Sequence, residues 1–87
     1  MQNNTLFVDG LVALVQQYAA MSSADRQGPV GQSIRERIRV IGETADYFEG
    51  FEGMQRLLRE AEGKVGDDGS MVRWLDGMWD RVGEWVS

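Results

Sequence analysis

The acidic side chains come closest to a pattern that could do chemistry. Asp76, Asp80 and Glu84 recur every fourth residue, which aligns three carboxylates along one side of a helix. Such a row can hold a cation or face a basic partner, although solvated carboxylates are more common. The segment GDDGS at 66–70 superficially resembles a calcium loop, but it lacks the length and the distal glutamate of an EF-hand. We predict no metal site, and we interpret residues 63–69 as a turn.

Groups suited to acid–base or nucleophilic catalysis are scarce. The chain has no histidine and no cysteine, which removes the commonest general base and the thiol nucleophile. Lys64 is the only lysine, and we expect it to be exposed and protonated because glycines flank it beside a turn. Neither a glycine-rich phosphate loop nor a cofactor motif is present. We therefore predict a protein that is not an enzyme, with no catalytic residues and no cofactor.

Three arginines, Arg35, Arg37 and Arg39, lie within five residues. Arg39 has Glu36 and Glu43 at helical i,i+3 and i,i+4 spacing, so a solvated and partly ion-paired surface is expected there. Arg37 differs because it lies at the edge of an apolar stripe, where its stem can pack and its guanidinium can meet a carboxylate. An anion site built from these arginines is an alternative.

The tryptophans stand out among the apolar residues. At about 100° per residue, the apolar positions between 71 and 86 fall within an arc of about 160°, which is wider than a coiled-coil seam. The rings either fill the core of a small protein or leave at least one anchor for a partner. We predict an interaction surface on the first and last helices, formed by Trp74, Trp79, Trp85, Met78, Leu11 and Tyr18, with Arg37 of the second helix as a further interaction residue.

Four amphipathic segments position these residues. Their apolar spacing predicts helices at about 5–21, 30–49, 51–65 and 70–86. Pro29 suits the first position of the second helix, and Gly50 ends that helix because glycine adopts positive φ without steric cost. Short connections favour antiparallel neighbours. The predicted fold class is all-α, a compact bundle of four helices in a single domain spanning residues 1–87.

The second helix carries a narrow apolar stripe formed by Val30, Ile34, Ile38, Ile41, Ala45 and Phe48. Several glycines lie inside the predicted helices, where each costs about 0.5–1 kcal/mol relative to alanine. Gly42 and Gly83 border apolar residues. We expect both to let a neighbouring backbone or a bulky ring approach closely.

Composition limits the classes of partner. The net charge of −5 disfavours nucleic acid, and neither a signal peptide nor a membrane span is recognised in the first 24 residues. Residues 1–40 contain four basic and three acidic side chains, whereas residues 41–87 contain five basic and eleven acidic ones. Such opposed halves attract each other within one molecule or between two. The absence of cysteine gives mild support for the cytoplasm.

Two segments resemble parts of small uncharacterised bacterial helical proteins. They are IRVIGETADYFEGFEGMQ at 38–55, in which an IG helix precedes a glycine-rich break and MQ, and WLDGMWDRVGEW at 74–85, a closing helix of the W…G…GEW type. The resemblance covers about half of the chain. It implies a bacterial source and a helical fold, and it transfers no activity and no functional residue.

These observations predict an acidic, cytoplasmic protein–protein interaction module that self-associates, as a homodimer, or docks another protein through helices one and four. Three alternatives remain. A small apolar ligand could bind between Leu11, Leu14, Trp74 and Trp79. An acidic inhibitor that mimics nucleic acid would need the carboxylates of residues 43–84 on one open face. An enzyme would need clustered acidic groups in a cleft.

Overall fold

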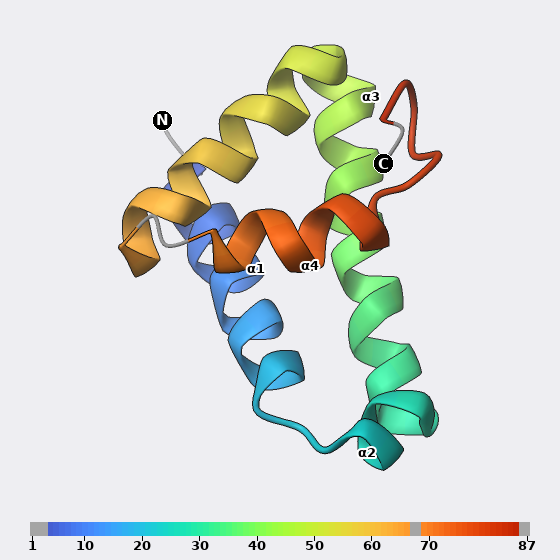
Figure 1. Ribbon diagram of the computed structural model, residues 1–87. Helices are drawn as coiled ribbons and strands as arrows, with labels where there is room; N and C mark the ends of the chain where they lie inside the picture. The colour runs from blue at the N-terminus through green and yellow to red at the C-terminus, as the bar shows by residue number, and fades with distance from the viewer. Residues whose placement is uncertain (1–3, 67–68, 86–87) are drawn as a thin grey trace.

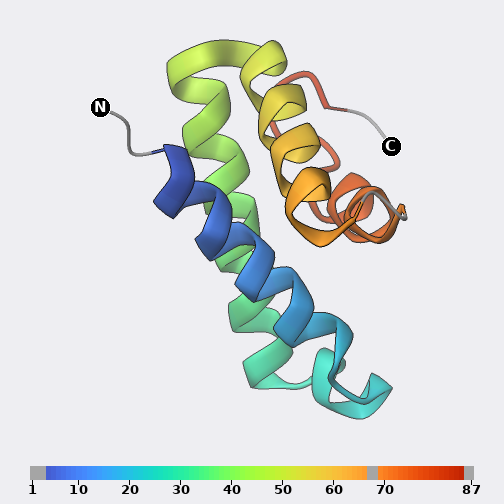
Figure 2. The same cartoon turned by 90° about the vertical axis from the view of Figure 1, so that its left-hand side faces the viewer.

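The computed structural model describes residues 4–66 and 69–85, which form four helices and no strand. The helices are α1 (Asn4–Ala19), α2 (Ser23–Gln27), α3 (Pro29–Val65) and α4 (Ser70–Met78). α3 is bent into two arms, and α4 crosses from one arm to the other (Figure 1). α1 lies along the first of these arms and runs antiparallel to it (Figure 2). The predicted all-α, compact helical bundle is confirmed.

α3 is one long helix with a sharp bend at Gly50. This residue adopts φ 72° and ψ −164°, a region that glycine occupies freely and that strains any other residue. The bend divides α3 into a first arm, residues 29–49, and a second arm, residues 51–65, which meet at the top of Figure 1. The break predicted at Gly50 is therefore confirmed, and the arms correspond to the second and third predicted helices.

The link after α1 contains a short helix that the sequence did not predict. α1 ends at Ala19, two residues before the predicted end, and α2 forms within the segment expected to be a loop. The hydroxyl of Ser22 accepts a hydrogen bond from the backbone N–H of Asp25 over 3.2 Å and so caps α2. α2 has no buried residue, so hydrophobic periodicity gave no signal for it.

α4 is shorter than predicted. The predicted end at residue 86 lies outside the described residues, but the helix already ends at Met78. Arg39 donates from Nη1 to the backbone oxygens of Met78 and Asp80 over 2.9 and 3.1 Å, and so binds the carbonyl of the last helical residue and a carbonyl of the turn that follows. The apolar repeat continues beyond this point, although the chain has left the helix.

The segment after α4 folds back along the first arm of α3. Arg81 and Gly83 adopt positive φ angles of 70° and 58°, and the N–H of Arg81 donates to the carbonyl of Trp85 over 2.7 Å. A Cβ at Gly83 would collide with the carboxylate of Asp46. A neighbour does approach Gly83 closely, but it is a carboxylate and not the backbone or bulky ring that was predicted.

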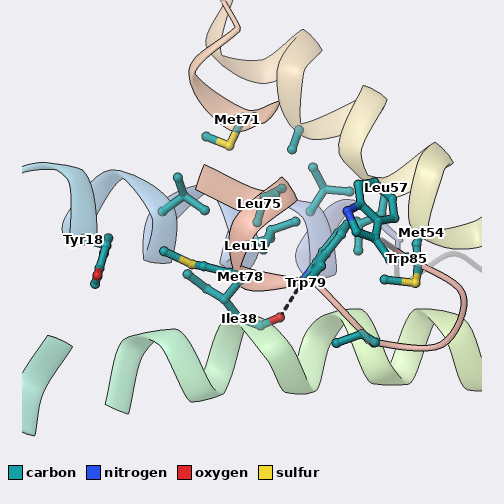
Figure 3. Packing of buried hydrophobic residues seen from close by; sticks show 14 of the residues in the cluster. Leu11, Tyr18, Ile38, Met54, Leu57, Met71, Leu75, Met78, Trp79 and Trp85 are labelled. Atoms are coloured by element: carbon teal, nitrogen blue, oxygen red, sulfur yellow. Dashed lines mark hydrogen bonds between the residues drawn. The ribbon is translucent and has the colours of Figure 1, made fainter. Parts of the chain in front are cut away.

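Trp79 occupies the centre of the core. Its side chain is 0% exposed, and its indole Nε1 donates to the carbonyl of Ile38 over 2.9 Å (Figure 3). A Cβ at Gly42 would lie 2.6 Å from that nitrogen, so only glycine admits the ring at this distance. The expected approach of a bulky ring to Gly42 is confirmed. The buried cluster consists of Val8, Leu11, Val15, Tyr18, Ile34, Ile38, Met54, Leu57, Ala61, Met71, Leu75, Met78, Trp79, Val82 and Trp85.

Candidate interaction surface

Five of the seven residues expected at an interaction surface lie in the core. They are Leu11, Tyr18, Met78, Trp79 and Trp85, each with at most 9% of its surface exposed. The physical reason is the shortened α4: the turns after it bring Trp85 back against Trp79, with ring centroids 5.2 Å apart in edge contact. The α1 and α4 surface expected from the sequence is therefore turned inward in the protomer.

Trp74 is half-buried, and a cation covers its ring. The Arg26 guanidinium lies 4.8 Å from the Trp74 ring centroid, while its Nε and Nη2 donate to the backbone oxygens of Tyr18 and Ala19 over 3.0 and 2.7 Å. Tyr18 meets Trp74 edge-on at 5.4 Å. Arg26 thus caps the end of α1 and shields an aromatic face. No pattern in the sequence indicated this role.

The predicted row of three carboxylates does not form on one helix, because α4 ends before Asp80 and Glu84. Trp85 binds Asp76, the member of that row that α4 contains. Its Nε1 donates to Asp76 Oδ1 over 3.1 Å, and its ring lies 5.5 Å from that of Phe51. Trp85 therefore ties α4 to the second arm of α3. Asp76 acts here as a structural acceptor in the protomer.

The acidic side chains serve several separate contacts. Glu49 pairs with Arg56, and Lys64 Nζ lies 3.1 Å from Asp9 Oδ1, joining the end of α3 to α1. Within the described residues there is no group of three potential metal ligands, and the two aspartates at 67–68 lie outside them. The acidic-inhibitor alternative thus loses part of the single open carboxylate face that it requires.

The arginines of the first arm have different environments. Arg39 is half-buried and caps α4, in place of the ion pairs expected with Glu36 and Glu43. Arg35 and Arg37 are exposed. No carboxylate among residues 4–66 and 69–85 forms an ion pair with Arg37, so its guanidinium is available to solvent or to another molecule.

Among the described residues, most of the exposed large apolar side chains lie on the first arm of α3, and Val72 on α4 is the exception. Val30, Val40, Tyr47 and Phe48 are 60%, 55%, 81% and 74% exposed. At about 100° per residue, these four positions fall within an arc of about 100° that also contains the polar positions Ser33, Arg37 and Thr44 of the arm. We give the name α3 stripe to the part of this surface formed by Val30, Arg37, Val40, Thr44, Tyr47 and Phe48.

The sequence did not predict the α3 stripe, for two reasons. Val30 and Phe48 belong to the apolar stripe that was predicted to face the core, but they are exposed and lie near the two ends of the first arm. α1 begins before it reaches the bend at Gly50 (Figure 2). Val40 and Tyr47 lie seven residues apart and outside the apolar stripe predicted for this helix. Their spacing was the available signal, because apolar residues one heptad apart share a face.

An open groove adjoins the end of the α3 stripe that lies nearest the bend at Gly50. It has a volume of about 700 Å³ and lies between the start of α1 and both arms of α3. Thr44 and Phe48 belong to both the groove and the stripe, and the Glu49–Arg56 pair stands at its rim. The ligand site expected between Leu11, Leu14, Trp74 and Trp79 is instead packed core and core rim.

Comparisons of this chain with protein-family models, curated proteins and solved structures found no match. The resemblance to small bacterial helical proteins therefore stays a prediction. None of the helices in the described part of the chain combines the length and the apolar character needed to cross a bilayer.

Proposed function

We propose that this protein is a non-enzymatic interaction module that binds a second copy of itself through the α3 stripe. One observation carries the proposal: Tyr47 and Phe48 contact each other edge-on at 5.0 Å while remaining 81% and 74% exposed. Adjacent aromatic residues outside the core are typical of surfaces that a partner covers. The proposal keeps the self-association predicted from the sequence and moves it to α3.

The exposed area of the α3 stripe limits the affinity that we expect for the dimer. Two aromatic side chains present on the order of 300 Å² per copy, so covering them in both copies removes roughly 600 Å² from water. A stable interface buries about 1,200–2,000 Å². Val40, Thr44 and flanking polar atoms must supply the remainder. We therefore expect a reversible dimer with a dissociation constant in roughly the micromolar range.

The supporting chemistry is consistent with a binding role. The sequence contains no histidine and no cysteine, and every buried side chain of the core cluster is hydrophobic. The proposal also keeps the bacterial cytoplasm as the place of action, since a protein without cysteine needs no oxidising compartment.

Sedimentation velocity from about 5 μM to 1 mM tests the proposal. The wild-type chain should shift from monomer to dimer, and the double variant Tyr47→Ser/Phe48→Ser should stay monomeric because it removes the exposed rings. Val72→Ser is the matched control, because Val72 is a 40% exposed apolar residue on α4. A wild-type chain that is monomeric throughout, or a double variant that dimerises equally well, overturns the proposal.

The groove favours a second candidate function, the binding of a small apolar ligand. Its volume of about 700 Å³ lies within the range of ligand sites, and Phe7, Ala45 and Leu57 supply apolar walls. Thermal shift with the fluorescent probe anilinonaphthalene sulfonate tests this candidate. The probe should raise the melting temperature of the wild type and not that of Ala45→Leu, which narrows the groove; equal shifts reject specific binding there.

A further inference from the structure

The first arm of α3 is electrically polar along its length. Its α2-proximal part, residues 30–40, carries Arg35, Arg37 and Arg39 against one glutamate, whereas residues 41–49 carry three acidic side chains and no basic one. The arm is helical from Pro29 to the bend, so these groups separate along one axis (Figure 1). Two such arms attract each other when they run antiparallel and repel when they run parallel.

The exposed residues of the α3 stripe also differ along the arm, because the cation of Arg37 and the rings of Tyr47 and Phe48 lie at different levels of the helix. Arg37 lies about 15–16 Å along the helix from Tyr47 and Phe48, so the guanidinium and the rings are too far apart to meet within one protomer. All three are exposed, and they share the stripe. Only a second molecule can bring that cation to those rings.

We propose that two copies pair their first arms antiparallel, so that Arg37 of each copy packs against Tyr47 and Phe48 of the other. The proposal rests on the proposed self-association. The twofold axis crosses the arm at the level of residues 42–43, and it sets Val40 of each copy opposite Thr44 of the other. A guanidinium over aromatic rings is attracted by the ring quadrupole, and the contact strengthens as it loses water.

Two first arms that run parallel lack both the contacts of Arg37 with the rings and the attraction between basic and acidic parts. It would place Arg37 against Arg37 and the acidic part of each arm against the acidic part of the other, and like charges opposite each other oppose association. The antiparallel arrangement also forms an isologous interface, in which the same residues contribute twice and the assembly closes at two copies.

A charge swap within one chain tests the orientation. Sedimentation should show that Arg37→Glu and Phe48→Arg each weaken the dimer at least about tenfold, because each disrupts two contacts. The double variant Arg37→Glu/Phe48→Arg should recover most of the wild-type affinity, because the introduced carboxylate of each copy then faces the introduced guanidinium of the other. In a parallel pair, the same double variant would set like charges together and would stay monomeric.

The matched control is Arg35→Glu/Phe48→Arg, which has the same net charge but places the acid away from the stripe. It should remain at least about tenfold weaker than the wild type, because the introduced guanidinium then lacks an opposite charge on the stripe. A wild-type dimer that tolerates Arg37→Glu, or a swap that fails to recover, overturns the antiparallel pairing and leaves the proposed self-association standing. A wild-type chain that never dimerises overturns both.

Discussion

Single residues determine how closely α3 and the C-terminal segment approach. The Trp79 ring makes two contacts with the first arm, since its Nε1 is hydrogen-bonded to the Ile38 carbonyl and the same edge of the ring lies against Gly42. Both constraints act on a ring with no exposed surface, so it has little room to move. Trp79 is thus held to the first arm by an interaction that requires glycine at position 42.

Gly42→Ala should destabilise the fold. The added Cβ would lie 2.6–2.9 Å from three atoms of the Trp79 ring, and overpacking of this kind costs about 1–3 kcal/mol. The higher helix propensity of alanine offsets about 1 kcal/mol. We expect a net loss of up to about 2 kcal/mol, measured by urea unfolding followed by Trp fluorescence.

The matched control for that measurement is Gly10→Ala. Gly10 lies inside α1, and a Cβ there would meet nothing within 4 Å. Alanine at that position should therefore be neutral or stabilise the fold by up to about 1 kcal/mol. A Gly42→Ala protein as stable as Gly10→Ala would contradict the packing argument.

Residue types predicted some of these contacts and not others. Gly42 was identifiable because it lies beside Ile38 and Ile41, so a neighbour had to pack over it. The capping roles of Arg26 and Arg39 were not identifiable, because each depends on which carbonyls the fold brings near the guanidinium. Sequence spacing carries no information about such distant acceptors.

At the scale of elements, the bend in α3 decides how the molecule closes. Straight continuation of the first arm would separate Phe51 and the second arm from Trp85, whose ring lies 5.5 Å from that of Phe51. The bend requires a backbone conformation that only glycine adopts without strain. Gly50 was recognisable from the sequence because it interrupts two apolar stripes that are out of phase.

Gly50→Ala should destabilise the fold by about 1–3 kcal/mol through backbone strain alone. A Cβ at Gly50 would meet nothing within 4 Å, so steric overlap with neighbours is not the cause. Gly63→Ala is the control, since it lies in the second arm with equally open surroundings and no positive φ. Thermal unfolding followed by circular dichroism measures both; a Gly50→Ala protein that melts with Gly63→Ala would contradict this account.

The end of α4 shows where periodicity misleads. Trp79, Val82 and Trp85 keep helical spacing and are all buried, yet the chain between them forms turns. Burial alone creates the pattern here, because a turn that folds back on the core also alternates inward and outward residues. Arg81 in the left-handed region gave no warning, since arginine rarely adopts it.

At the scale of the whole molecule, the exposed surface depends on where the helices lie against one another. All four stripe-forming apolar residues of α3 are on a helix that was predicted correctly. Whether they are covered depends on the path of α1 and on the length of α4, which helix periodicity does not give. The fold class was therefore predictable, whereas the location of the interaction surface was not.

Self-association should make thermal stability depend on protein concentration. A dimer that forms only from folded chains stabilises them by mass action, so the melting temperature should rise between about 5 μM and 500 μM. For a domain of this size, 1 kcal/mol corresponds to about 4–8 °C. Tyr47→Ser/Phe48→Ser should abolish the rise, while Val72→Ser should retain it.

A small ligand in the groove would act differently, because it would raise the melting temperature at a fixed protein concentration. A wild-type melting temperature that stays constant across the whole range would argue against dimerisation through the α3 stripe.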